Sequence, residues 1–121
     1  MTAGRTVTVQ TSDHGPVTLP EPSWCAGVHP GGGRRSDLSH YGRPTKVTLD
    51  NGRLLIEAQL AQWPYSVRDT APFVALELGD AEGEYDQAAL LELARNLLTF
   101  AAVTIPELRV RLAAATEEAR L

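Results

Sequence analysis

Apolar and polar positions divide the chain into three zones, 1–44, 45–78 and 86–121. The first zone is rich in glycine and proline. Within it, only residues 6–11 alternate valine with polar neighbours, a pattern that predicts a short half-buried strand. A turn is expected directly afterwards, at 13–16, where aspartate, histidine, glycine and proline follow one another. The remainder of this zone is expected to be a loop-rich segment.

The middle zone alternates apolar and polar residues as the strands of a half-buried sheet do. The alternation runs over 45–49, 54–61 and 73–78. Asn51 and Gly52 separate the first two runs, and both residue types tolerate the positive φ angles of a tight hairpin turn. We therefore expect a small antiparallel sheet of three to four strands with a hairpin at its centre.

The last zone has the period of a helix, with apolar residues at helical spacing from Leu90 onward. Asp86 is placed to cap the N-terminus of this helix. In a continuous helix, Pro106 would clash with the carbonyl four residues earlier, so a break or sharp kink is expected there. Thr104 and Glu107 have the spacing of a capping box that would begin a second helix. The predicted fold is α+β, a small antiparallel sheet covered by one or two C-terminal helices.

The hairpin and the first helix are expected to enclose the core. The side chains expected to be most buried are Ile56, Leu60, Val74, Leu76, Leu93 and Leu97. In the last helix, Ile105, Leu108 and Leu112 form a narrow apolar stripe, which is typical of a helix–helix seam. We expect this stripe to meet a protein partner or a second copy of the chain. The alternative is that the helix folds back on the sheet.

Composition narrows the class of protein. A chain of 121 residues is enough for a single domain, 1–121, and its 43% hydrophobic and 21% charged residues indicate a folded globular protein. The net charge of −4 argues against a nucleic-acid binder, which needs concentrated lysine and arginine. No uninterrupted apolar run approaches the roughly 20 residues that span a bilayer, and the N-terminus lacks the apolar core of a signal peptide. The lone cysteine gives no sign of an oxidising compartment, so we expect a cytoplasmic protein with no membrane partner.

The only cysteine lies among two of the three histidines, in a chain that has few such residues. Glu21, Cys25 and His29 are spaced four residues apart, so a short turn would project them toward one side, and His40 follows. Carboxylate, thiolate and imidazole are the ligands of tetrahedral Zn²⁺. We therefore expect Glu21, Cys25, His29 and His40 to bind zinc, with His14 as a substitute for Glu21. The alternative is a free, partly buried cysteine beside two surface histidines.

The segment EPSWCAGVH, with its histidine downstream, resembles a family of small uncharacterised actinobacterial proteins that open with Cys-Pro-x-Trp-Cys-x₃-His. The residues that match are Pro22, Trp24, Cys25, His29 and His40. Glu21 stands where the family has its first cysteine. The family pattern looks like a Cys₂His₂ zinc site, so the resemblance implies that this chain has exchanged one ligand or lost the metal. The resemblance implies no particular activity.

Sequence motifs for catalysis are absent: the chain has neither a Gly-x-Ser-x-Gly elbow nor a His-Glu-x-x-His helix. Three consecutive glycines at 31–33 lack the strand, helix and lysine of a phosphate-binding loop and are expected to form a flexible, solvated link. The sequence thus favours a non-enzymatic protein-interaction or scaffold domain with a structural zinc knuckle. The alternative is a metal- or thiol-dependent enzyme in which Cys25 is paired with His29 or His40.

Overall fold

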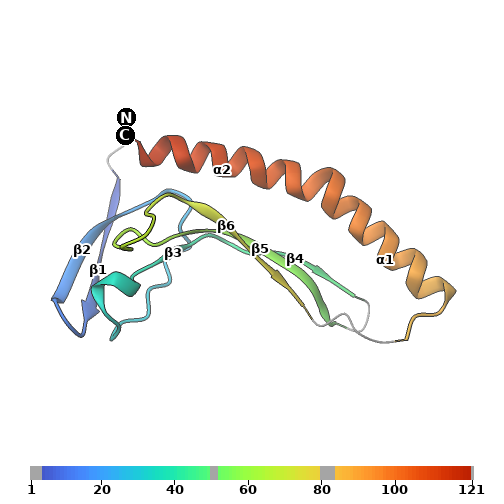
Figure 1. The fold of residues 1–121 in the computed structure, drawn as a ribbon, viewed down its shortest axis with the longest axis horizontal. Coiled ribbons are helices and arrows are strands. Elements are labelled where there is room, and N and C mark those ends of the chain that lie inside the picture. Colours follow the sequence, from blue (N-terminus) through green and yellow to red (C-terminus); the bar gives the residue numbers. More distant parts are fainter. Residues whose placement is uncertain (1–3, 50–51, 80–83, 121) are drawn as a thin grey trace.

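The computed structural model describes residues 4–49, 52–79 and 84–120. An N-terminal β-hairpin adjoins a four-stranded antiparallel sheet, and one long C-terminal helix arches over that sheet (Figure 1). The α+β class expected from the sequence is confirmed, with two small sheets and one continuous helix.

The N-terminal hairpin pairs β1 (Arg5–Thr11) with β2 (Gly15–Glu21) in antiparallel register. The turn between them was expected, but β2 was not, because it contains Pro16 and Pro20. Proline cannot donate to a ladder, yet a two-stranded sheet leaves one edge of each strand unpaired, where the missing N–H costs nothing. Gly15 starts the return strand with a φ of 61°, a left-handed conformation that suits glycine.

The glycine-rich segment packs against this hairpin. The Gly32 N–H donates to the Gln10 carbonyl at 3.0 Å, and the Ser12 N–H donates to the Gly33 carbonyl at 2.8 Å. A short 3₁₀ turn, η1 (Arg35–Asp37), follows. The glycines are exposed to solvent, as expected, but backbone hydrogen bonds attach the segment to the end of β1.

The second sheet consists of β3 (His40–Tyr41), β4 (Thr45–Thr48), β5 (Leu54–Gln62) and β6 (Phe73–Leu78). All pairs are antiparallel and all involve β5. Because β6 pairs with stretches of β5 that also pair with β4 and β3, it must lie along the opposite edge of β5 from those two strands. The predicted strands are confirmed, and the short β3 is an addition that the alternation pattern did not indicate.

The predicted hairpin between β4 and β5 is also present. Leu49 and Arg53 close it through a backbone hydrogen bond of 2.8 Å. Gly52 has a φ of 82°, the positive angle for which a glycine was expected at this point. Asp50 and Asn51, the other residues of the predicted turn, lie outside the described residues.

The C-terminal helix begins where its capping signal indicated. Asp86 precedes α1 (Gln87–Thr99), and its side chain accepts a hydrogen bond of 2.8 Å from the Ala89 N–H. This arrangement satisfies one of the backbone donors that a helix start leaves free.

The expected break at Pro106 does not occur. A π-helical turn, η2 (Phe100–Thr104), joins α1 to α2 (Ile105–Ala119), so the helix bends without ending (Figure 1). In a π-helical turn, each N–H bonds to the carbonyl five residues earlier instead of four. This change in the bonding pattern accommodates Pro106, which has no N–H and whose ring would clash with the carbonyl four residues earlier. The predicted capping box is wrong for the same reason: Thr104 keeps helical backbone angles and its side chain makes no capping hydrogen bond.

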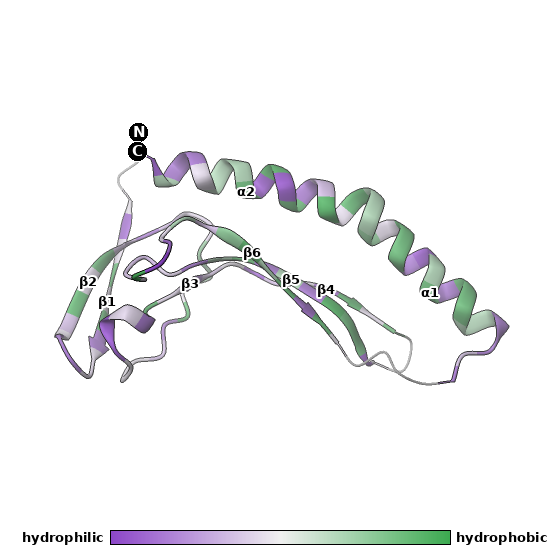
Figure 2. Ribbon diagram, in the orientation of Figure 1, coloured by the Kyte–Doolittle hydropathy of each residue, from purple (hydrophilic) through white to green (hydrophobic). Residues whose placement is uncertain are grey.

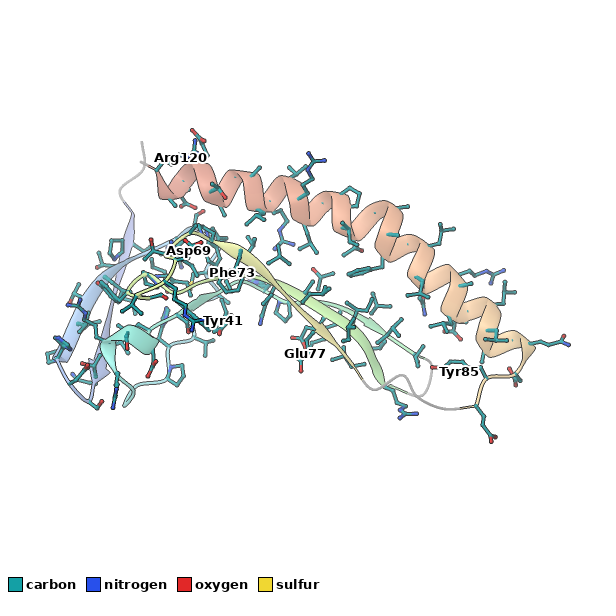
Figure 3. All side chains as sticks on the ribbon, in the orientation of Figure 1. Tyr41, Asp69, Phe73, Glu77, Tyr85 and Arg120 are labelled. Atoms are coloured by element: carbon teal, nitrogen blue, oxygen red, sulfur yellow. The ribbon has the colours of Figure 1, made fainter. Side chains whose placement is uncertain are left out.

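Two small hydrophobic clusters form the core. One lies under the N-terminal hairpin, and its buried members are Val9, Leu19 and Leu38. The other lies between the four-stranded sheet and the helix, and its buried members are Leu55, Ile56 and Phe100. Among the expected core residues, Ile56 and Leu60 are buried, whereas Leu76 and Leu97 are 56% and 43% exposed. One helix is too narrow to cover every strand, so the apolar side of β6 stays open. Glu77 of β6 projects away from the helix, which leaves its neighbours Leu76 and Leu78 on the helix side (Figure 3).

Much of the helix surface is both apolar and exposed (Figure 2). Leu108, in the stripe expected to meet a partner, is buried, whereas Leu91, Leu98, Val103 and Val110 are about half exposed or more. By length and composition alone, the 33-residue helix Gln87–Ala119 would be able to cross a membrane. A single helix of this kind is weak evidence for a membrane protein.

Candidate metal centre

The loop after β2 folds into a turn that aligns the first ligand-type side chains. Glu21 is the last residue of β2, and the Cys25 N–H donates to the Pro22 carbonyl at 3.0 Å, which closes the turn. Gly27 leaves the turn with a φ of 85°, a left-handed conformation that suits glycine. The guanidinium of Arg5 reaches the carbonyls of Pro22 and Cys25 at 3.4 Å, so β1 also holds the turn.

The fourth ligand-type residue comes from the other sheet. His40 begins β3, where it is paired with Gln62 of β5. The Ala26 N–H donates to the Tyr41 carbonyl at 2.9 Å, which ties the turn to β3. The rings of His29 and His40 meet edge to face, with 5.4 Å between their centroids.

Glu21, Cys25, His29 and His40 converge on one point. Each offers one ligand atom, and these four atoms lie within 4.8 Å of one another. The Cys25 Sγ is 3.0 Å from Glu21 Oε1 and 3.6 Å from His29 Nε2. Glu21 Oε1 also contacts His29 Nε2 and lies 4.0 Å from His40 Nδ1. One carboxylate oxygen therefore faces the other three ligand atoms.

The cluster is shielded from solvent. The side chains of Glu21, His29 and His40 are 8%, 6% and 2% exposed, and Cys25 is buried. His40 Nδ1 is fully buried and has no hydrogen-bond partner. An unpartnered buried nitrogen is costly, and a metal ion at the centre of the cluster would satisfy it.

Without a metal, the charges of the cluster follow from burial and from its internal contacts. Burial alone would raise the pKa of Glu21, but hydrogen bonds from His29 and Cys25 outweigh it and lower that pKa overall. Burial, reinforced by the Glu21 carboxylate, raises the pKa of the Cys25 thiol. Burial and the neighbouring His29 lower the pKa of His40, which favours the neutral imidazole that metals bind.

The structure brings together all four residues that the sequence singled out as zinc ligands. His14, the expected substitute for Glu21, is not among them. It lies at the β1–β2 turn, where its Nδ1 is 3.0 Å from Asp13 Oδ1. Trp24, one of the residues that match the family pattern, meets the His40 ring edge to face, with 6.4 Å between the ring centroids. A cavity of about 640 Å³ borders the cluster, and both Glu21 and His40 line it.

Sequence reasoning missed the contact that fastens the loop carrying Ser23 and Cys25 to the helix. The Glu118 carboxylate of α2 accepts hydrogen bonds from the backbone N–H and from the hydroxyl of Ser23. No local signal would have found this pair, because 95 positions separate its two members.

Comparisons with known proteins identify a family but no chemistry. Neither curated proteins nor solved structures gave a significant match. The family model named DUF6907, a domain of unknown function, matches residues 6–114, a span that contains all four residues of the cluster. The chain therefore belongs to the DUF6907 family.

Proposed function

We propose that this chain is a non-enzymatic interaction or scaffold domain whose N-terminal loop is held by a structural Zn²⁺ ion. The observation that carries the proposal is the convergence of four ligand atoms, from Glu21, Cys25, His29 and His40, within 4.8 Å. A buried set of four ligand atoms, one of them an imidazole nitrogen with no hydrogen-bond partner, suits a tetrahedral metal site.

The donor set favours zinc over the hard cations. One sulfur, two nitrogens and one oxygen suit a borderline-soft ion, whereas Ca²⁺ and Mg²⁺ prefer oxygen ligands throughout. A thiolate and a carboxylate also balance the two positive charges of Zn²⁺, so the filled site is neutral. Neutrality reduces the cost of burying the ion.

Four protein ligands are typical of a structural site, since catalytic zinc keeps one position for water or substrate. The alternative, a metal-dependent enzyme, draws support from the cavity that Glu21 and His40 line. The two readings differ in whether an outside ligand can reach the metal. Loading the chain with Co²⁺ and adding azide separates them: an unchanged visible spectrum supports the structural site, and a new spectrum supports an open one.

Metal content of the untagged, purified chain tests the zinc site directly. We expect one Zn²⁺ ion per chain in the wild type and a large loss in Cys25→Ser and in His29→Ala. His14→Ala is the matched control, because this histidine lies outside the cluster and its loss should leave the zinc content unchanged. A wild-type chain that takes up no zinc, even when refolded with it, would overturn the proposal.

The interaction role rests on the exposed apolar face of the helix. We propose that this face binds a protein, with a second copy of the chain as the first candidate. Leu91, Leu98 and Ile105 are each about half exposed or more and recur every seven residues, with Ala94 and Ala101 between them. The steps between these five positions alternate between three and four residues, which is the pattern of a helix–helix seam.

A further inference from the structure

The cavity beside the metal centre has the character of a ligand site. Its volume of about 640 Å³ falls within the usual range for small-molecule pockets. It lies between the end of β2 and the C-terminal end of α2, so residues from both ends of the chain line it. Ala115 and Glu118 come from the helix, while Trp24, Tyr65 and Pro64 come from loops next to the sheets.

The lining combines apolar and aromatic surface with negative charge. Prolines, a leucine and alanines form much of the wall, and Trp24 and Tyr65 add two aromatic side chains. The polar lining residues include the carboxylates of Glu21 and Glu118. Among the residues that the structure describes, no lysine or arginine lines the cavity. Two guanidiniums adjoin the lining: Arg35 lies 4.7 Å from the centroid of the Tyr65 ring, and Arg5 donates to the Pro22 carbonyl at 3.4 Å. The carboxylates of the lining itself are the groups that would attract a cation.

The Glu118 carboxylate is held ready for a ligand. Each of its oxygens accepts one hydrogen bond of 2.9 Å from Ser23. A carboxylate has about four acceptor positions, so these two bonds fix its orientation and leave further capacity. Glu21 would be occupied by a bound metal, which leaves Glu118 as the charge available to a ligand in the metal-loaded chain.

We infer that this cavity binds an organic cation, an ammonium group carried on a small apolar body. The Trp24 side chain and the Glu118 carboxylate would receive the ammonium group, because the Tyr65 ring already has the Arg35 guanidinium over it. The proline and alanine walls would receive the apolar body. Binding of such a cation does not require the metal, so this inference stands or falls separately from the proposed zinc site.

Three probes with one benzyl body and different charges test the inference: benzyltrimethylammonium, benzyl alcohol and benzylsulfonate. Each is titrated into the full chain, in its zinc-loaded and metal-free forms, while amide chemical shifts are recorded. We expect the cation to shift the amides of Trp24, Tyr65 and Ala115 and to bind at least about tenfold more tightly than the other two probes. If the cation leaves those amides unmoved, or if all three probes bind alike, the inference is wrong.

A matched pair of variants locates the charge that matters. Glu118→Gln keeps an acceptor for Ser23 but removes the charge, and we expect it to weaken cation binding several-fold. Glu117→Gln removes the same charge one position earlier, on a side chain that is 72% exposed and outside the lining, and we expect no change. Equal cation affinity in Glu118→Gln and wild type would also overturn the inference. Circular dichroism of both variants confirms that each is folded before it is titrated.

Discussion

The Glu118 carboxylate accepts hydrogen bonds of 2.9 Å from both the backbone N–H and the hydroxyl of Ser23. These two bonds join the last turns of α2 to the loop that carries Cys25 and His29. Ala115, three residues earlier on the same helix, is buried. The pair therefore fastens two segments that lie 95 positions apart.

Glu118→Ala should loosen the end of α2. Two hydrogen bonds to an exposed carboxylate contribute on the order of 1 kcal/mol, so we expect faster amide exchange over roughly the last two turns and little change in α1. Hydrogen–deuterium exchange measures this. Glu117→Ala is the control, and exchange that is equally fast in both variants would show that the Ser23 contact does not hold the helix.

Removal of zinc should loosen one region selectively. With the metal chelated, or in Cys25→Ser, residues 20–41 should exchange faster while β4, β5 and β6 stay protected, because these three strands have their own ladder and core. Free zinc at about a thousand times its Kd should stabilise the wild type by about 4 kcal/mol. Thermal unfolding with and without zinc measures this shift, and a shift of the same size in Cys25→Ser would contradict it.

Phe100 and Leu97 should respond differently to truncation. Phe100 is buried between the sheet and the helix, so Phe100→Ala should cost about 3–5 kcal/mol from lost burial and the cavity left behind. Leu97, expected from the sequence to be core, is 43% exposed, so Leu97→Ala should cost at most about 1 kcal/mol. Urea unfolding of the two variants compares them. Equal losses would mean that the helix rotates about its axis in solution.

Gly79 tolerates no side chain at the end of β6. A Cβ at this position would overlap the Leu54 carbonyl oxygen, a backbone atom that cannot move aside cheaply. We expect Gly79→Ala to destabilise the chain by at least about 2 kcal/mol. Gly33→Ala is the control, because its nearest neighbour would be 3.9 Å away. A melting temperature that Gly79→Ala does not lower would show that the strand end shifts freely.

The exposed seam of the helix should govern self-association. Sedimentation of the wild type should show a dimer at micromolar concentration, and Leu98→Glu should convert it to a monomer. Val67→Glu, at a loop position that is 95% exposed, should leave the dimer intact. A folded wild-type monomer at high micromolar concentration would exclude the homodimer. Flotation of the same sample with lipid vesicles would then test whether a bilayer covers the seam.

The sequence predicted local structure correctly wherever neighbouring residues determine the backbone conformation. Asp86 marked the helix start, and the alternation over 73–78 marked β6, because capping and strand periodicity act within a few residues. The ligand-type cluster was readable for the same reason, since three of its members come from one turn. The fourth, His40, was found because histidine is scarce in this chain.

Features that depend on distant neighbours were not readable. The two prolines of β2 argue against a strand until its partner and its free edge are known. Pro106 argues against a continuous helix until the π-helical turn before it is seen. Exposure of Leu76 and Leu97 depends on how much of the sheet one helix can cover, which no local pattern records.

The position of the cluster has a consequence for how the two sheets are joined. Glu21 is the last residue of β2 in one sheet, and His40 is the first residue of β3 in the other. A zinc ion bound to both side chains would therefore cross-link the two ends of the segment between these strands. A cross-link that closes a loop of this size removes about 3 kcal/mol of chain entropy from the unfolded state, on the same reasoning that applies to a disulfide. A chain with a single cysteine cannot form an internal disulfide, and a metal bridge would give it the same restraint in a form that a chelator reverses.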